Sequence, residues 1–295
     1  MSETDRASPA CGAREPRPWL SHEEVAYVRC RGCGTAYHRD PPPWDRIEHK
    51  YQEAYYAQRG HADPAIEACK QATAAAYFRR LAHAPGRRLL EVGCSAGAGL
   101  AAAAAAGWQA TGVELSTPAA EIARRRPGVR AVHTGRLEDA PLSPASFDAA
   151  VMFDVIEHID PPLAVLRTLH GLLAPAGLLL LVTPEGDSLS ARLLGRRWAH
   201  LFIEHVVLFS RRGLRTLLST AGFEVLGSGF AWKRVNLDML VRHARLHPQV
   251  TGGGVLRLLG RMLPAAPQRA LLPFNIGEFW MLARRADATP AHVRV

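Results

Sequence analysis

Long apolar runs are missing from this chain of 295 residues. No run reaches the roughly 18 apolar residues that a membrane-spanning helix requires, because Pro175 and Gly177 interrupt the longest candidate, 171–182. The first ten residues contain no apolar core of the kind found in secretory signals. We therefore expect a cytoplasmic protein without a transmembrane segment.

Cysteine and acidic residues are also scarce. The chain has 5 cysteines, and an odd number without a signal peptide argues against a disulfide framework. Its 36 Lys and Arg residues outnumber 27 Asp and Glu residues, which gives a net charge of +9. A basic balance can indicate a nucleic acid or an anionic surface as partner. The arginines are scattered and form no stripe with interleaved aromatics, so the pattern favours solvated charges and makes a nucleic-acid partner unlikely.

Composition divides the chain into four regions. A hydrophobic content of 48% is enough for one large core, or for one core and a small appendage. Residues 1–47 are rich in proline and arginine, and 48–84 have helical spacing. Residues 87–230 alternate short apolar runs with helical stretches, and 231–295 contain a basic amphipathic piece and one last apolar run. The predicted parts are an N-terminal segment (1–47), a helical cap (48–84) and a main domain (85–295) with an insertion or lid at 231–272.

The third region predicts an α/β fold. Strands alternate with helical stretches such as 99–106 and 118–126, which is typical of βαβ units, with a parallel sheet covered by helices on both faces. Ligands of such sheets bind beyond the carboxyl ends of the strands. The predicted strands are Arg88–Val92, Gln109–Val113, Arg130–His133, Phe147–Phe153 and Gly177–Thr183.

A turn of small residues follows the first of these strands, in the sequence E-V-G-C-S-A-G from Glu91 to Gly97. Glycines at a strand-to-helix turn permit positive φ and a close approach to the backbone. A dinucleotide turn would read G-x-G-x-x-G, but the second glycine is missing here. Glu91 would repel a phosphate and suits a ligand with a cationic end. Glu114 ends the next strand, 21 residues after Gly93, where an acid can accept hydrogen bonds from both ribose hydroxyls.

This combination resembles the nucleotide-methionine pocket of class I S-adenosylmethionine-dependent methyltransferases, whose turn reads E/D-x-G-x-G-x-G. The turn here is a common variant with Ser95 at the middle glycine. Later motifs follow in the family's order, including S-F-D-A-A-V (146–151), D-V-I-E-H (154–158) and A-G-F-E-V (221–225). The resemblance, closest to the ubiquinone-methyltransferase type, covers about 85–230.

The resemblance implies a Rossmann-like fold with a seven-stranded, mostly parallel sheet whose last strand lies antiparallel beside the sixth. It also implies S-adenosyl-L-methionine as the cofactor. Arg136 stands where the family often has Asp, so Glu138 or Asp139 would make the adenine-amine contact. Cys94 is expected to be a small buried spacer, because nothing nearby would activate it as a nucleophile. The implied cofactor-binding residues are Glu91, Gly93, Cys94, Ser95, Gly97, Glu114, Leu115, Leu137, Glu138, Phe153 and Asp154.

Three histidines are candidates for the catalytic base. The sulfonium is already a good methyl donor, so the enzyme mainly aligns the acceptor, and a hydroxyl acceptor also needs a base near neutral pH. His158 follows the fourth strand, where it serves as base or packs near the adenosyl group. His200 and His205 lie in a segment resembling the W…H…F-S stretch that borders the acceptor pocket of ubiquinone-type enzymes. In that segment Ser210 would cap the helix that begins at Arg211.

The N-terminal cysteines resemble a zinc ribbon that has lost one ligand. Residues 30–34 read C-R-G-C-G, a metal-binding knuckle, and residues 8–12 read S-P-A-C-G, with Ser8 in place of the first cysteine. Three interpretations stay open: a zinc site completed by a histidine or water, a degenerate ribbon held by packing, and a redox pair. The candidate metal ligands are Cys11, Cys30 and Cys33, with His22 or His38 as a fourth.

The C-terminal stretch contains a basic amphipathic piece at 253–272. It predicts a cover over the acceptor pocket or, as the alternative, a peripheral contact with a membrane surface. Residues 274–284 resemble the family's final strand.

The leading functional hypothesis is methyl transfer to a small-molecule acceptor, which is a secondary metabolite, sugar or quinone-like compound. Oxygen is the favoured acceptor atom, and carbon is the alternative. One alternative is an RNA methyltransferase with an N-terminal zinc ribbon. Enzymes that methylate exocyclic base nitrogens usually carry N/D-P-P-Y/F after the fourth strand, whereas residues 153–156 read F-D-V-I. This difference argues against that subclass and leaves other RNA methyltransferases open. A second alternative is a non-catalytic binding module, against which the intact Glu91, Gly93, Gly97 and Glu114 argue.

Overall fold

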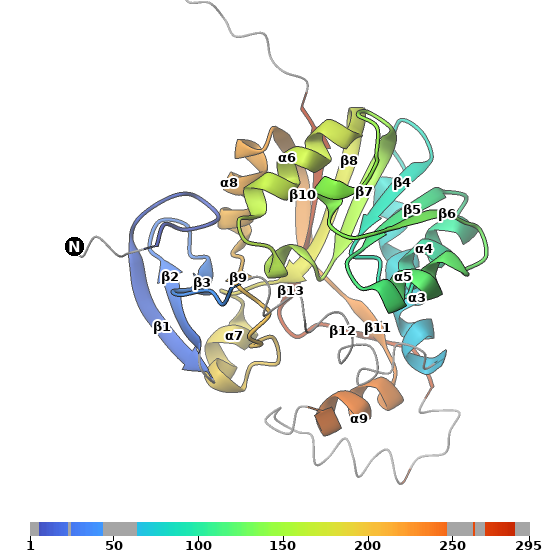
Figure 1. Cartoon of the computed structure of the whole chain (residues 1–295). Coiled ribbons are helices and arrows are strands. Elements are labelled where there is room, and N and C mark those ends of the chain that lie inside the picture. Colours follow the sequence, from blue (N-terminus) through green and yellow to red (C-terminus); the bar gives the residue numbers. More distant parts are fainter. Residues whose placement is uncertain (1–5, 23–24, 44–63, 247–261, 263–268, 287–295) are drawn as a thin grey trace, which may run out of the picture.

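The main structural element is a seven-stranded sheet with the strand order β10-β13-β8-β7-β4-β5-β6 (Figure 1). The computed structural model describes residues 6–22, 25–43, 64–246, 262 and 269–286. β13 runs antiparallel to both β8 and β10, and the other strands are parallel, which confirms the predicted topology. The strands are β4 (Arg88–Val92), β5 (Gln109–Glu114), β6 (Val129–Thr134), β7 (Phe147–Phe153), β8 (Leu173–Pro184), β10 (Phe223–Phe230) and β13 (Glu278–Arg285).

Helices cover both faces of this sheet, because the strands alternate their apolar side chains between two cores. In β7, Ala150 and Met152 join the core under α6 and α8, whereas Ala149 and Val151 join the core under α3, α4 and α5. The helices are α3 (Pro64–Phe78), α4 (Ala98–Ala105), α5 (Thr117–Arg124), α6 (Pro162–Leu172) and α8 (Arg211–Thr220).

The register of the central strands brings the predicted pocket to one edge of the sheet. Val92 of β4 pairs with Val113 of β5 and with Met152 of β7. The turn after β4, the acid at the end of β5 and the residues after β7 therefore follow neighbouring strand ends, where ligands of parallel α/β sheets bind.

A second, four-stranded sheet has the order β1-β2-β3-β9 and lies to the left of the main sheet in Figure 1. Its first three strands come from the N-terminal segment, and the fourth comes from the loop between β8 and α8. This shared strand joins the ribbon-like segment to the main domain. The strands are β1 (Pro16–His22), β2 (Val25–Cys30), β3 (Ala36–His38) and β9 (Val207–Leu208), and α7 (Leu189–Leu194) precedes β9.

The insertion before β13 begins with β11 (Lys233–Val235) and α9 (Leu237–Leu246) and ends with β12 (Leu272–Phe274). β11 pairs antiparallel with β12. Most of the amphipathic piece at 253–272 lies outside the described residues, as does the cap before residue 64, so the part of that cap described here is α3 with a short 3-10 turn after it. Among the described helices, none is long and apolar enough to cross a membrane.

Candidate active site

The turn after β4 has a backbone that side chains rarely allow. Gly93, Ser95 and Gly97 have φ values of 70°, 52° and 80°. A Cβ on Gly93 would lie 2.5 Å from Cγ2 of Val155, and one on Gly97 would lie 2.9 Å from Cα of Ala123. Glycine is therefore required at both ends of the turn. Ser95 keeps its left-handed conformation although it has a side chain, and such local strain is typical of ligand-binding turns.

Glu91 lies under this turn with 4% of its surface exposed. Its Oε2 is buried and has no hydrogen-bond partner in the described part of the chain. Burial, and then the charge of Glu114, raises the Glu91 pKa to about 8. A Cβ on Gly99 would overlap the Glu91 carboxylate, so this glycine leaves it room. A buried carboxylate with an unsatisfied oxygen is a site for a cationic group.

Glu114 ties the turn to the end of β5. Its Oε2 accepts a hydrogen bond from the Ser95 N–H at 2.8 Å, and its Oε1 accepts one from the Ser116 N–H at 2.8 Å. Burial raises the Glu114 pKa, and these backbone hydrogen bonds oppose the shift. Each carboxylate oxygen has a second lone pair, so Glu114 can still accept a hydrogen bond from each hydroxyl of a ribose.

Four more predicted cofactor residues follow the ends of β4, β5 and β6 along the chain. Leu115 is half-buried directly after Glu114, and Cys94 is buried with its thiol pKa raised well above the usual value by burial. Leu137 is buried at the start of a short 3-10 turn, in which Glu138 is exposed.

The end of β7 is covered by the last turn of α3. The Phe153 ring lies 6.0 Å from the Tyr77 ring and 6.2 Å from the Phe78 ring, between centroids. The two aromatic rings of α3 therefore pack against Phe153, which is a predicted cofactor-binding residue.

The structure brings the three candidate histidines together. The His158 ring lies 4.7 Å from the His205 ring, and the His205 ring lies 6.3 Å from the His200 ring. Nδ1 of His158 lies 2.9 Å from the Glu204 carbonyl oxygen, and Nδ1 of His205 lies 2.8 Å from the His200 carbonyl oxygen. A carbonyl oxygen only accepts, so each of these contacts is a hydrogen bond when the ring carries a hydrogen on Nδ1.

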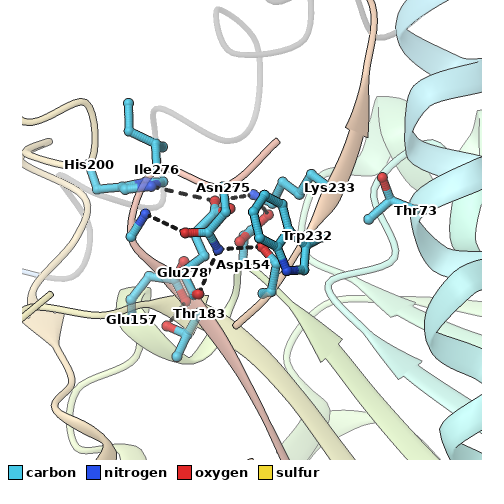
Figure 2. Close-up of polar contacts among 12 residues, drawn as sticks. Thr73, Asp154, Glu157, Thr183, His200, Trp232, Lys233, Asn275, Ile276 and Glu278 are labelled. Atoms are coloured by element: carbon cyan, nitrogen blue, oxygen red, sulfur yellow. Dashed lines mark hydrogen bonds and ion pairs between the residues drawn. The ribbon is translucent and has the colours of Figure 1, made fainter. Parts of the chain in front are cut away.

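A partly buried ion-pair network lies beside His200 (Figure 2). The Lys233 ammonium, from β11, lies 2.7 Å from Oδ2 of Asp154 and 2.5 Å from Oε1 of Glu278. Burial lowers the Lys233 pKa, but the two carboxylates outweigh this effect and raise it overall. His200 Nε2 lies 3.5 Å from the same Glu278 oxygen. The insertion is thus tied by its lysine to the ends of β7 and β13.

Glu157 adds a third carboxylate to this region. It is fully buried, and its Oε2 accepts a hydrogen bond from Thr183 Oγ1 at 2.9 Å. Burial, and then the charge of Asp154, raises the Glu157 pKa. Sequence reasoning missed Glu157, Glu278 and Lys233 as site residues. The first two stand inside recognisable motifs, D-V-I-E-H and N-I-G-E, whereas no local pattern marks Lys233.

Two groups of side chains in the described residues could hold a metal ion. In each group the ligand atoms lie within 4.8 Å of one another. One group is Glu157, His158 and His205, and the other is Cys11, Cys30 and Cys33. Neither His22 nor His38 belongs to the cysteine group, so the structure does not support these histidines as the fourth ligand.

Comparison with known proteins places the chain in a family. A family model described as a methyltransferase domain matches residues 66–227, which is more than half of the chain. The chain belongs to the class I S-adenosylmethionine-dependent methyltransferases. A solved S-adenosylmethionine-dependent methyltransferase from Thermotoga maritima has a TM-score of 0.52 with this chain at 22% identity, covering 82% of this chain and 100% of that one. At this identity the likeness concerns the fold alone.

Two relatives are named as ubiquinone biosynthesis O-methyltransferases. The protein from Xanthomonas campestris pv. campestris (strain B100) is 36% identical over 104 residues, which cover 34% of this chain and 44% of the relative. The mitochondrial protein from Schizosaccharomyces pombe is 30% identical over 137 residues, which cover 44% of this chain and 48% of the relative. The chain thus spans less than half the length of both relatives.

Proposed function

We propose that this protein transfers a methyl group from S-adenosylmethionine to a hydroxyl oxygen of a small-molecule acceptor. The observation that carries the proposal is the pair of buried acids beside a strained turn: Glu91 suits the ammonium of the cofactor, and Glu114 suits its ribose hydroxyls. The cofactor supplies an electrophilic methyl group on a sulfonium, which becomes a neutral thioether after transfer.

The protein's own contribution is alignment, exclusion of water and acceptance of a proton. His205 is 8% exposed, and the hydrogen bond from its Nδ1 to the His200 carbonyl orients the ring. Its Nε2 is suited to take the proton of an acceptor hydroxyl as the oxygen attacks. His158, whose ring packs edge-on against it, fixes the ring from the other side. The likeness to two O-methyltransferases supports oxygen as the acceptor atom, and a quinone-like phenol is the acceptor class we favour.

The test is a screen of phenolic and catecholic acceptors with labelled S-adenosylmethionine, read by mass spectrometry. We expect transfer to oxygen, and a loss of about 10²–10⁴-fold in kcat for His205→Ala, the range typical of a general base. His83→Ala changes an exposed histidine and serves as the matched control. Transfer only to RNA, or an unchanged kcat in His205→Ala, would contradict the proposal.

We propose in addition that the cluster of Cys11, Cys30 and Cys33 holds a zinc ion. Thiolate sulfur is a preferred ligand of structural zinc, which takes four ligands. Cys11 lies in the turn before β1, Cys30 ends β2, and Cys33 lies in the turn after it.

A further inference from the structure

Two N-terminal segments have the same backbone structure, although only one has both cysteines. In the segment 30–35, the Gly34 N–H donates to the Cys30 carbonyl at 2.9 Å, and the Cys30 N–H donates to the Thr35 carbonyl at 2.9 Å. In the segment 8–13, the Gly12 N–H donates to the Ser8 carbonyl at 2.8 Å, and the Ser8 N–H donates to the Ala13 carbonyl at 2.9 Å. Gly12 and Gly34 both have a positive φ, of 75° and 83° respectively. Ser8 therefore stands where Cys30 stands in the second knuckle.

The side chains of the two knuckles converge with the spacing of a tetrahedral zinc site. The Cys11 and Cys30 sulfurs are 3.7 Å apart, and Ser8 Oγ is 3.6 Å from the Cys33 sulfur. Zinc–sulfur bonds of about 2.3 Å and tetrahedral angles require sulfurs about 3.8 Å apart, and an oxygen ligand about 3.5 Å from a sulfur. Ser8 is 3% exposed, so its hydroxyl faces the cluster rather than solvent.

The cluster is connected to the loop that carries His205. The Ser210 hydroxyl donates to the Cys33 carbonyl at 2.5 Å and accepts from the Gly213 N–H at 2.9 Å, which caps α8. The Tyr27 hydroxyl lies 3.3 Å from the His205 carbonyl oxygen. The His38 N–H, at the end of β3, donates to the Val206 carbonyl at 3.0 Å. The knuckles and their strands thus contact residues 202–210 directly.

We propose that Cys11, Cys30 and Cys33 bind one zinc ion with the Ser8 hydroxyl at the fourth corner, and that this ion positions His205. Zinc displaces one proton from each of the three thiols. Without the ion, the metal bonds that hold the two knuckles together are lost. The strand β3, which follows the second knuckle and pairs with β9, is then held less rigidly. The second half of this inference rests on the proposed function, because it assigns His205 to the acceptor pocket.

The metal site is tested with the full chain, its metal content and cobalt substitution. We expect one zinc per chain and, with Co²⁺, the thiolate charge-transfer and visible bands of a tetrahedral site with three sulfurs. Ser8→Cys should bind Co²⁺ at least about tenfold more tightly and show a four-sulfur spectrum, whereas Ser8→Ala should bind about tenfold more weakly. Cys33→Ser should lose the ion, and Cys69→Ser, a buried cysteine in α3, should keep it. Equal binding by wild type, Ser8→Cys and Ser8→Ala, or no thiolate band in wild type, would overturn the site.

The positioning role has a readout that does not depend on activity. On removal of zinc we expect faster amide hydrogen exchange in residues 202–210 and unchanged exchange in β5, with the affinity for S-adenosylhomocysteine changed by less than about twofold. In an active preparation, acceptor KM should rise and kcat should fall together. Unchanged exchange in 202–210 would overturn the positioning role even if zinc is bound. Absence of methyl transfer would contradict the proposed function and leave the metal and exchange results to be judged separately.

Discussion

Glu91 should release a proton when the cofactor product binds. Its pKa is about 8 because the carboxyl group is buried next to Glu114. A ligand ammonium beside the unsatisfied Oε2 favours the charged carboxylate and lowers the Glu91 pKa. Binding of S-adenosylhomocysteine at neutral pH is therefore expected to expel the proton that Glu91 carries in the ligand-free protein.

The magnitude follows from this pKa. An acid with a pKa of about 8 is about nine-tenths protonated at pH 7 and about one-tenth protonated at pH 9. Binding should release about 0.9 proton at pH 7 and about 0.1 at pH 9. By linkage, the affinity should rise nearly tenfold per unit between pH 6 and pH 7, and should level off above pH 8.

Titration calorimetry in buffers with different ionisation enthalpies measures this proton directly. At pH 7 the observed heat should vary with the buffer's ionisation enthalpy with a slope of about 0.9 for wild type and near zero for Glu91→Gln. Glu121→Gln, a change of an exposed glutamate in α5, should behave as wild type. A slope near zero in wild type, or an unchanged slope in Glu91→Gln, would refute the reasoning.

Two further predictions concern the same edge of the sheet. Gly99→Ala places a methyl group on the Glu91 carboxylate and should weaken S-adenosylhomocysteine binding by at least about tenfold, a loss of about 1.4 kcal/mol, whereas Gly171→Ala, where a Cβ meets nothing within 4 Å, should leave calorimetric binding unchanged. Lys233→Met removes the cation that faces Asp154 and should lower the free energy of unfolding by about 2–4 kcal/mol in urea titrations. Its side chain is 23% exposed, which places the effect below that of a fully buried pair. A loss that does not shrink as the pH falls and the carboxyls become protonated would contradict this account of Lys233.

The α/β core could be predicted from the sequence because its strands are short apolar runs bounded by turns. The predicted strands Arg88–Val92 and Phe147–Phe153 have the observed bounds. The strand predicted to begin at Gly177 begins earlier, at Leu173, because Leu173 already pairs with Phe147. A register shift follows this pair. Pro175 and Gly177 conceal the early start in the sequence. Ser210 was expected to cap α8, and its hydroxyl does so.

The small sheet and the ion-pair network could not be predicted in the same way. β9 has two residues, Val207 and Leu208, and pairs with β3 about 170 residues earlier, so no local periodicity marks it. The contacts of Lys233 arise only when the insertion folds back over the ends of β7 and β13. The roles of the individual histidines remain predictions, since they depend on an acceptor that sequence motifs do not specify.

The measurement that tests the central claim most directly is calorimetric titration of the full chain with S-adenosylhomocysteine, beside Glu114→Ala and the exposed control Glu121→Ala. We predict micromolar binding by wild type and by the control. Glu114→Ala removes two charge-assisted ribose contacts and should weaken binding by about 100-fold, with its fold checked by circular dichroism. Folded wild-type protein that binds no S-adenosylhomocysteine, or a Glu114→Ala variant that binds as wild type does, would contradict the account.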